Sequence, residues 1–128
     1  TVNNGWDKKH GGIYRDGMHD GRLVVRDKEW WQNFESLTGL LDVYQVTEED
    51  CYLEKFFELW EFDHTYFYNS RTGESRQLLS EDGSVLIPDT GNQWKCIYHT
   101  DRAMMECRMR IDRILKESED ARKVQESL

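Results

Sequence analysis

The sequence predicts a mainly α-helical protein with two small β-hairpins, in which three helices form an arc of a larger ring. Three segments carry apolar residues at helical spacing, and two others carry short β-branched or aromatic runs that end in Gly-containing turns. The apolar and aromatic faces of the three helices are too wide for them to cover one another. The order hairpin, helix, helix, hairpin, helix is a loose repeat of a unit that must stack on neighbours.

Composition limits the possible partners. With 128 residues, 38% hydrophobic and 12% aromatic, the chain can form a single domain over 1–128. Its net charge of −8 opposes binding to nucleic-acid phosphates, so we expect no nucleic-acid partner. No run of about 18 apolar residues is present, so we expect no membrane span and no secretion signal. The polar start at Thr1, without an initiator Met, suggests a fragment.

The three cysteines, Cys51, Cys96 and Cys107, are odd in number and lack C-x-x-C spacing. This pattern indicates neither a disulfide framework nor a zinc site. We therefore expect reduced thiols in a cytoplasmic protein, and we expect neither a metal nor a cofactor.

The first two elements are a hairpin and a helix. Short β-branched runs with Gly-rich breaks between Gly5 and Asp27 predict a hairpin too small to be stable alone. Asp27 is a plausible N-cap for a helix over 28–44. Trp31 and Glu35, four residues apart, would project side by side as a sugar site requires, although a buried Trp beside a rim Glu has the same spacing. The apolar stripe comprises Trp30, Phe34, Leu37 and Leu41.

A second helix is expected over 48–66, and Thr47 with Asp50 resembles a capping box at its start. Apolar residues flank its stripe as well, so we expect contacts on more than one face. His64 lies on the stripe and is interpreted as a hydrogen-bonded core or interface histidine. The stripe comprises Leu53, Phe57, Trp60, His64 and Phe67, and the flanking residues are Tyr52, Phe56, Leu59 and Phe62.

The second hairpin is predicted over 75–79 and 84–87, around a turn at Glu81-Asp82-Gly83. A last helix should begin at His99 or Thr100. Residues 117–128 are mostly charged and should fray or continue as a solvated helix. The stripe of this helix comprises Met104, Cys107, Ile111, Ile114 and Leu115.

Trp94 and His99 precede the last helix and suggest chemistry. An indole offers a flat apolar face to a sugar ring, and a histidine, with an ordinary pKa of about 6.5, can take and give a proton near neutrality. The pattern Trp-x-x-x-x-His is weak on its own, and a histidine at a helix start is often structural.

Three pieces of the chain, taken together and in order, resemble the C-terminal part of the N-acylglucosamine 2-epimerase and cellobiose 2-epimerase family. They span nearly the whole chain. They are Gly5-Trp6-Asp7 with Gly11-Gly12-Ile13-Tyr14, then Asp27-Lys28-Glu29-Trp30-Trp31-Gln32-Asn33-Phe34-Glu35, then Trp94-Lys95-Cys96-Ile97-Tyr98-His99-Thr100-Asp101-Arg102.

The resemblance implies an (α/α)6 barrel whose inner helices line a sugar pocket. His99 would match a catalytic histidine, and Trp31, Glu35 and Trp94 would match residues in or beside the pocket. The family moves a proton at the carbon next to a sugar carbonyl, through an enediolate, with two histidines exchanging the roles of acid and base. The implied partner is a small reducing sugar, and the chain would form homo-oligomers or associate with a missing N-terminal part.

The chain departs from the family pattern at several positions. The second catalytic histidine of the family lies upstream of the portion present, so this chain alone should be incomplete and inactive. Asn33 replaces the usual Gln of the Trp-Trp-x-Gln-x-Glu pattern, and Ser75 and Arg76 replace aromatic residues.

Two other interpretations stay open. A glycoside hydrolase on the same type of helical ring would use carboxylates such as Glu35 and Asp101. A non-catalytic carbohydrate-binding or subunit-interaction module would need no second histidine. The residues leave open which sugar is bound and whether the activity is epimerase or isomerase.

Overall fold

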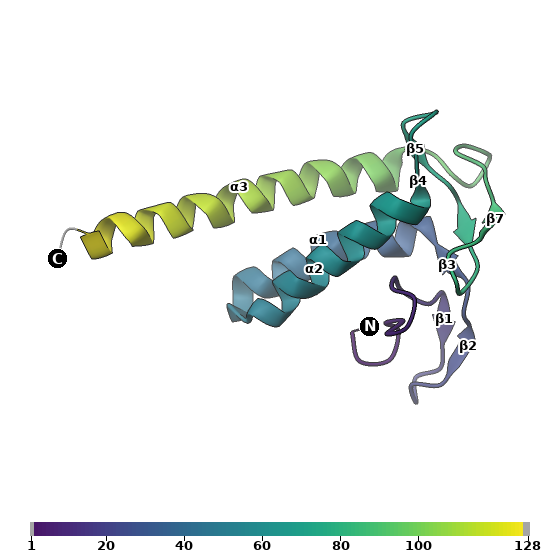
Figure 1. Ribbon diagram of the computed structural model, residues 1–128, viewed down its shortest axis with the longest axis horizontal. Helices are drawn as coiled ribbons and strands as arrows, with labels where there is room; N and C mark the ends of the chain where they lie inside the picture. The colour runs from purple at the N-terminus through teal and green to yellow at the C-terminus, as the bar shows by residue number, and fades with distance from the viewer. Residues whose placement is uncertain (1, 127–128) are drawn as a thin grey trace.

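A computed structural model describes residues 2–126 of the protein (Figure 1). The structure is mainly helical, and its strands are two or three residues long and lie at one end of the helices (Figure 1). The helices are α1 (Trp30–Thr47), α2 (Asp50–Phe62), the π-helix η1 (Asp63–Phe67) and α3 (Tyr98–Glu126). The strands are β1 (Asp16–Gly17), β2 (Leu23–Val25), β3 (Lys28–Glu29), β4 (Tyr68–Asn69), β5 (Glu74–Ser75), β6 (Leu78–Leu79) and β7 (Val85–Ile87).

Both predicted hairpins are confirmed. Strands β1 and β2 pair antiparallel, and a single bridge between Trp6 and Ile13 precedes them. Strands β6 and β7 also pair antiparallel, and Gly83 in the turn between them has a φ of 89°, which a side chain would disfavour. Strand β3 adds to β6, so that Lys28 lies opposite Leu79. This third strand, and the small pair β4–β5, were not expected from the sequence.

Helix α1 begins later than the sequence predicted. Because Lys28 and Glu29 pair with β6, the extended residue before the helix is Glu29, and the prediction of Asp27 as N-cap is wrong. The helix ends at Thr47, where Glu48 adopts the left-handed conformation with a φ of 58°. The predicted stripe of Trp30, Phe34, Leu37 and Leu41 is confirmed as buried.

Helix α2 buries the flanking face, as expected, but only part of the predicted stripe: Phe67 is buried and Leu53 is partly buried against the core. Phe57 is 59% exposed and Trp60 39%, whereas the flanking residues Phe56, Leu59 and Phe62 belong to the core shared with α1. The predicted capping box is also wrong, because Glu49 is the N-cap and its side chain makes no capping bond. The face of Phe57 and Trp60 is therefore open within residues 2–126.

His64 is exposed and does not lie in the core, which corrects the sequence-based interpretation. Its ring stacks between those of Trp60 and Tyr68, at centroid distances of 6.2 and 5.3 Å. Trp60 of α2, His64 of η1 and Tyr68 of β4 thus form a stack of three rings at the end of α2.

Helix α3 runs from Tyr98, one residue before the predicted start, to Glu126. Residues 117–126 are therefore a solvated helix rather than a frayed tail, and residues 127–128 lie outside the described residues. Of the predicted stripe, Cys107 is buried and Met104, Ile111 and Ile114 are partly buried against the core, but Leu115 is 56% exposed.

A buried ion pair joins the N-terminal loop to the sheet of β3, β6 and β7. Nζ of Lys28 donates to Oδ2 of Asp7 at 2.9 Å and also to the carbonyl of Glu81, and both Lys28 and Asp7 are buried. Burial acts to raise the pKa of Asp7, but hydrogen bonds from Lys28 and from the backbone N–H groups of His10 and Lys9 outweigh it. The pKa of Asp7 therefore lies well below its ordinary value.

All three cysteines are free thiols, Cys51 and Cys96 on the surface and Cys107 in the core. Across residues 2–126, none of the helices combines the length and the hydropathy that a membrane crossing requires.

Candidate functional site

The site is centred on a hydrogen bond between helices α1 and α3. Nδ1 of His99, in the first turn of α3, lies 2.8 Å from Oε1 of Glu35 on α1. A carboxylate can only accept here, so Nδ1 carries a proton, and in the neutral form of the ring Nε2 is the acceptor nitrogen. The His99 side chain is 33% exposed, which leaves it open to a ligand.

Arg102 holds the other side of the same carboxylate. It lies three residues after His99, on the same face of α3, and its Nε is 3.3 Å from Oε1 of Glu35. Its Nη2 donates to Oε2, so the guanidinium grips both oxygens of Glu35. Arg102 was not among the predicted site residues, although its spacing of three residues from His99 places both on one face of a helix.

Aromatic rings surround His99. The Trp31 ring lies 5.9 Å from the imidazole, Trp30 approaches edge-on at 6.2 Å, and Tyr98 at 5.0 Å. The structure thus brings Trp31, Glu35 and His99 together, as the sequence predicted. Trp94 is 79% exposed, and within the described residues it is not among the rings that contact His99.

Buried polar contacts fix the segment that carries His99. Nζ of Lys95, itself buried, lies 3.3 Å from Oε1 of Glu74 and over the ring of Trp30 at 5.3 Å. Five residues later, in the first turn of α3, the hydroxyl of Thr100 lies 3.2 Å from that of Ser75. The start of α3 is therefore attached to both β5 and α1.

Glu74 is part of this attachment. Burial acts to raise its pKa, but hydrogen bonds from Ser75 and Thr100 and the charge of Lys95 outweigh burial and lower the pKa. The carboxylate is therefore ionised at neutral pH and serves as the counter-ion of Lys95.

Asn33 and Arg76, which depart from the family pattern, each hydrogen-bond to the backbone of other segments. Asn33 is buried, accepts from the Ile13 N–H at 2.9 Å and donates to the Glu29 carbonyl at 2.9 Å. Nη1 of Arg76 donates to the Tyr66 and Tyr68 carbonyls at 2.9 and 2.7 Å, which satisfies backbone acceptors at the end of η1. These side chains hold loops in place and do not contact His99.

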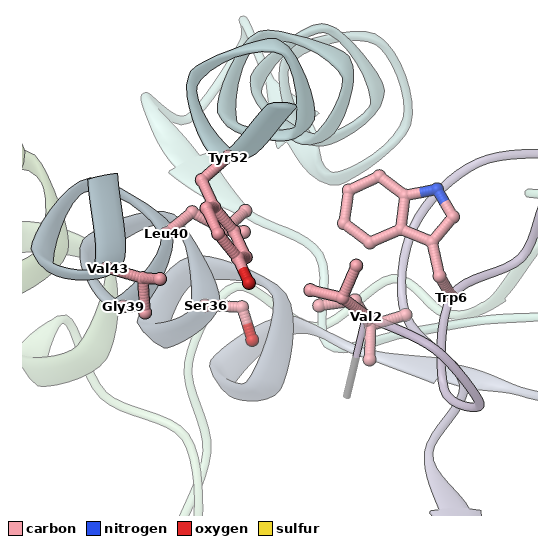
Figure 2. Close-up of a pocket in the computed structure, with 8 residues that line it drawn as sticks. Val2, Trp6, Ser36, Gly39, Leu40, Val43 and Tyr52 are labelled. Atoms are coloured by element: carbon pink, nitrogen blue, oxygen red, sulfur yellow. The ribbon is translucent and has the colours of Figure 1, made fainter. Parts of the chain in front are cut away.

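Two adjoining cavities lie along α1. The first, about 430 Å³, is lined by Trp31, Glu35 and Tyr14, among others; His99 does not line it but contacts both Trp31 and Glu35. In the second, about 290 Å³, the side chains of Tyr52 and Leu40 lie on one side and those of Val2 and Trp6 on the other (Figure 2). Ser36, Gly39 and Ile13 line both cavities. The first cavity is within the size range of small-ligand pockets and has the polar groups that orient a ligand.

Asp101, named for a hydrolase mechanism, lines a different cavity, one that Glu35 does not line. Both oxygens of Glu35 are already engaged by His99 and Arg102. The structure therefore does not present these two carboxylates as a pair across one cavity.

Within residues 2–126, one group of side chains has the spacing of metal ligands, namely Asp7, His10 and Glu81. Nζ of Lys28 donates to the Asp7 carboxylate and to the Glu81 backbone, so a buried ammonium group already serves as the counter-ion of Asp7. A cation there would have to displace a buried charge, and we assign no metal to the cluster.

Residues 1–103 match the N-acylglucosamine 2-epimerase family. The N-acylglucosamine 2-epimerase of Bos taurus is 28% identical over 115 residues, which are 87% of this chain and 27% of that protein. The cellobiose 2-epimerase of Dictyoglomus turgidum is 34% identical over 90 residues, 70% of this chain and 23% of that protein. The chain thus spans about a quarter of the length of these relatives.

Solved structures agree with these matches. A D-mannose isomerase superimposes on 83% of this chain and 27% of its own, with a TM-score of 0.78 and 26% identity. A cellobiose 2-epimerase from Spirochaeta thermophila superimposes on 81% of this chain and 26% of its own, with a TM-score of 0.69 and 30% identity.

Proposed function

The chain belongs to the N-acylglucosamine 2-epimerase family, and from that membership we propose that it supplies the C-terminal part of a catalytic site. The enzyme would be a carbohydrate 2-epimerase or an aldose–ketose isomerase. Its relatives include proteins named for each reaction, a cellobiose 2-epimerase and a D-mannose isomerase. The observation that carries the proposal is the His99–Glu35 hydrogen bond beside Trp31.

In the proposed reaction, a base removes the proton from C2 of an open-chain sugar and an enediolate forms. Return of the proton to the other face of C2 gives the epimer, and its return to C1 gives the ketose. His99 would act through Nε2, because Glu35 engages Nδ1. The carboxylate fixes the orientation of the ring and stabilises the imidazolium that forms when Nε2 takes the proton. Trp31 would pack against the sugar ring.

We further propose that the three helices form an arc of an (α/α)6 barrel, as the family resemblance implies. The open face of Phe57 and Trp60 on α2 would contact another helix of the ring. A second catalytic histidine would come from that remaining part, so this chain alone would bind sugar without turning it over. Trp94 would approach the sugar only in the assembled site.

We also propose a cytoplasmic location, which agrees with the three free thiols.

The test follows deuterium at C2. D-Mannose, cellobiose and N-acetylglucosamine would each be incubated in heavy water with the polypeptide that carries this chain and its second histidine. Proton NMR would follow the loss of the C2 signal and the appearance of epimer or ketose. Exchange that depends on His99 supports the proposal.

Other outcomes would contradict it. Hydrolysis of a disaccharide with a blocked reducing end would favour the glycosidase interpretation, because an enediolate cannot form from such a sugar. Sugar binding without any C2 exchange in the complete polypeptide would favour a non-catalytic carbohydrate-binding module.

A further inference from the structure

A further cavity lies between α1, the end of α2 and the start of α3. Its volume is about 240 Å³, and its lining includes Asp63 but not His99 or Glu35. Phe34 and Met104 form apolar walls, and Asp101 adds a second carboxylate. It is therefore distinct, among the described residues, from the cavity beside Trp31 and Glu35.

Asp63 is an unpaired carboxylate in this cavity. It is 2% exposed, and neither Oδ1 nor Oδ2 has a hydrogen-bond partner within the described part of the chain. A buried polar group without a partner is costly, and native proteins satisfy nearly all such groups. Burial also raises the pKa of Asp63 well above its ordinary value. A ligand that donates to both oxygens would remove this cost.

We propose that this cavity binds a guanidinium group, with Asp63 as its counter-ion. A guanidinium presents two parallel N–H donors and matches the two unpaired oxygens of one carboxylate, whereas an ammonium is a point charge. It is also more weakly hydrated than an ammonium, so apolar walls such as Phe34 and Met104 oppose its entry less. Asp101 would add attraction for a cation as it approaches.

A metal ion is a poorer match for the cavity. Among residues 2–126, the one cluster with metal-ligand spacing is that of Asp7, His10 and Glu81, which does not include Asp63. The guanidinium could belong to a free small molecule or to an arginine side chain of a polypeptide. The chemistry at Asp63 is the same for both sources. This inference goes beyond the proposed sugar chemistry and does not depend on it.

The test is a binding titration on the 128-residue chain, followed by NMR shifts of the amides of 63–68. The probes are n-propylguanidinium, as a free compound, and N-acetylarginine methylamide, which adds a peptide backbone to the same group. We expect saturable binding that Asp63→Asn weakens by roughly 30-fold or more, because the variant removes a buried charge partner. Glu61→Gln removes an exposed carboxylate at the end of α2, two residues before Asp63, and should leave binding unchanged.

The two probes distinguish the sources. Tighter binding of the arginine derivative indicates the side chain of a polypeptide, and tighter binding of propylguanidinium indicates a free molecule. Absence of saturable binding by both probes, or equal binding to wild type and Asp63→Asn, would overturn the proposal.

A second measurement avoids dependence on the folding of a variant. Carboxyl-carbon NMR of the wild-type chain would follow Asp63 during a pH titration, with and without saturating probe. We expect the probe to lower the pKa of Asp63, because a cation favours the ionised carboxylate. His64, Tyr68 and Asp101 also line the cavity and must be titrated in the same spectra. An Asp63 pKa that the probe does not change would contradict the proposal.

Discussion

Glu35 accepts a hydrogen bond from Nδ1 of His99 at 2.8 Å, although 64 residues of sequence separate the two. Arg102 grips the same carboxylate from the next turn of α3. Because both donors come from α3 and the acceptor from α1, any change in the packing of these helices would alter the direction of Nε2. The proposed catalytic geometry therefore depends on one interhelical contact.

Replacing Glu35 with Gln should slow C2 proton exchange by up to about 10⁴-fold, the effect of replacing the carboxylate that orients the histidine of a Ser-His-Asp triad. The amide cannot stabilise an imidazolium as a carboxylate does, so kcat should fall more than KM rises. Exchange rates in heavy water would check this. Asp42→Asn is the matched control, since Asp42 pairs with Arg110 across the same two helices at 2.6 Å. Equal losses in both variants would indicate a structural role only.

His99→Ala and Trp31→Ala should differ in kind. Removing a general acid/base typically lowers the rate by about 10²- to 10⁴-fold, so His99→Ala should abolish C2 exchange while sugar binding persists. An aromatic platform contributes to substrate and transition state alike, so Trp31→Ala should appear chiefly in KM. Kinetics and deuterium incorporation in the complete enzyme would decide, and wild-type exchange in His99→Ala would exclude His99 from the mechanism.

Asp63→Asn should stabilise the chain at pH 8. The pKa of Asp63 is raised on folding, so stability falls as pH rises from about 3.9, the unfolded value, towards the folded pKa. An amide of the same shape avoids this loss, and we expect a gain of about 1–3 kcal/mol in the free energy of unfolding. Urea denaturation at pH 8 and at pH 3.5 would measure it, with the gain confined to the higher pH. Asp120→Asn, on the exposed end of α3, is the control.

Asp7→Asn should destabilise the chain by about 3–5 kcal/mol at pH 7, because the buried ammonium of Lys28 loses its counter-ion. The pKa of Asp7 is lowered on folding, so its contribution is complete above about pH 3.9 and is lost as pH falls below that value. The difference between wild type and variant should therefore shrink in acid. Denaturation series between pH 7 and pH 2 would test this, and a difference independent of pH would contradict it.

The open face of α2 should make the chain self-associate. Phe57 is 59% exposed and Trp60 39%, on the same side of the helix as one another. Phe57→Gln should reduce association, whereas Glu54→Gln, on an exposed position of the same helix, should not. Sedimentation velocity over a range of concentrations would report the change. A monodisperse wild-type chain would show that this face needs no partner.

The spacing of apolar residues along the sequence correctly predicted the features that lie within a single helix. The α1 stripe that includes Phe34 and Leu37, and the adjacent pair Trp31 and Glu35, lie as the spacing indicated. The family motif added His99. Periodicity did not predict which face of α2 is buried, because both faces are apolar and only packing against α1 selects Phe56 over Phe57. The cavity of Asp63 was missed for a related reason, since its walls come from three helices distant in sequence.

The π-helix η1 determines the direction, around the axis of α2, in which the chain leaves this helix towards β4. Phe62 and Phe67 are both buried although they are five residues apart, and Tyr66, the residue that an unbroken α-helix would bring inward, is 38% exposed. Each residue of an α-helix advances the chain by about 100° of rotation. Shortening η1 by a single residue would therefore turn the exit towards β4 by about that angle, and the chain that leads to α3 would leave in another direction.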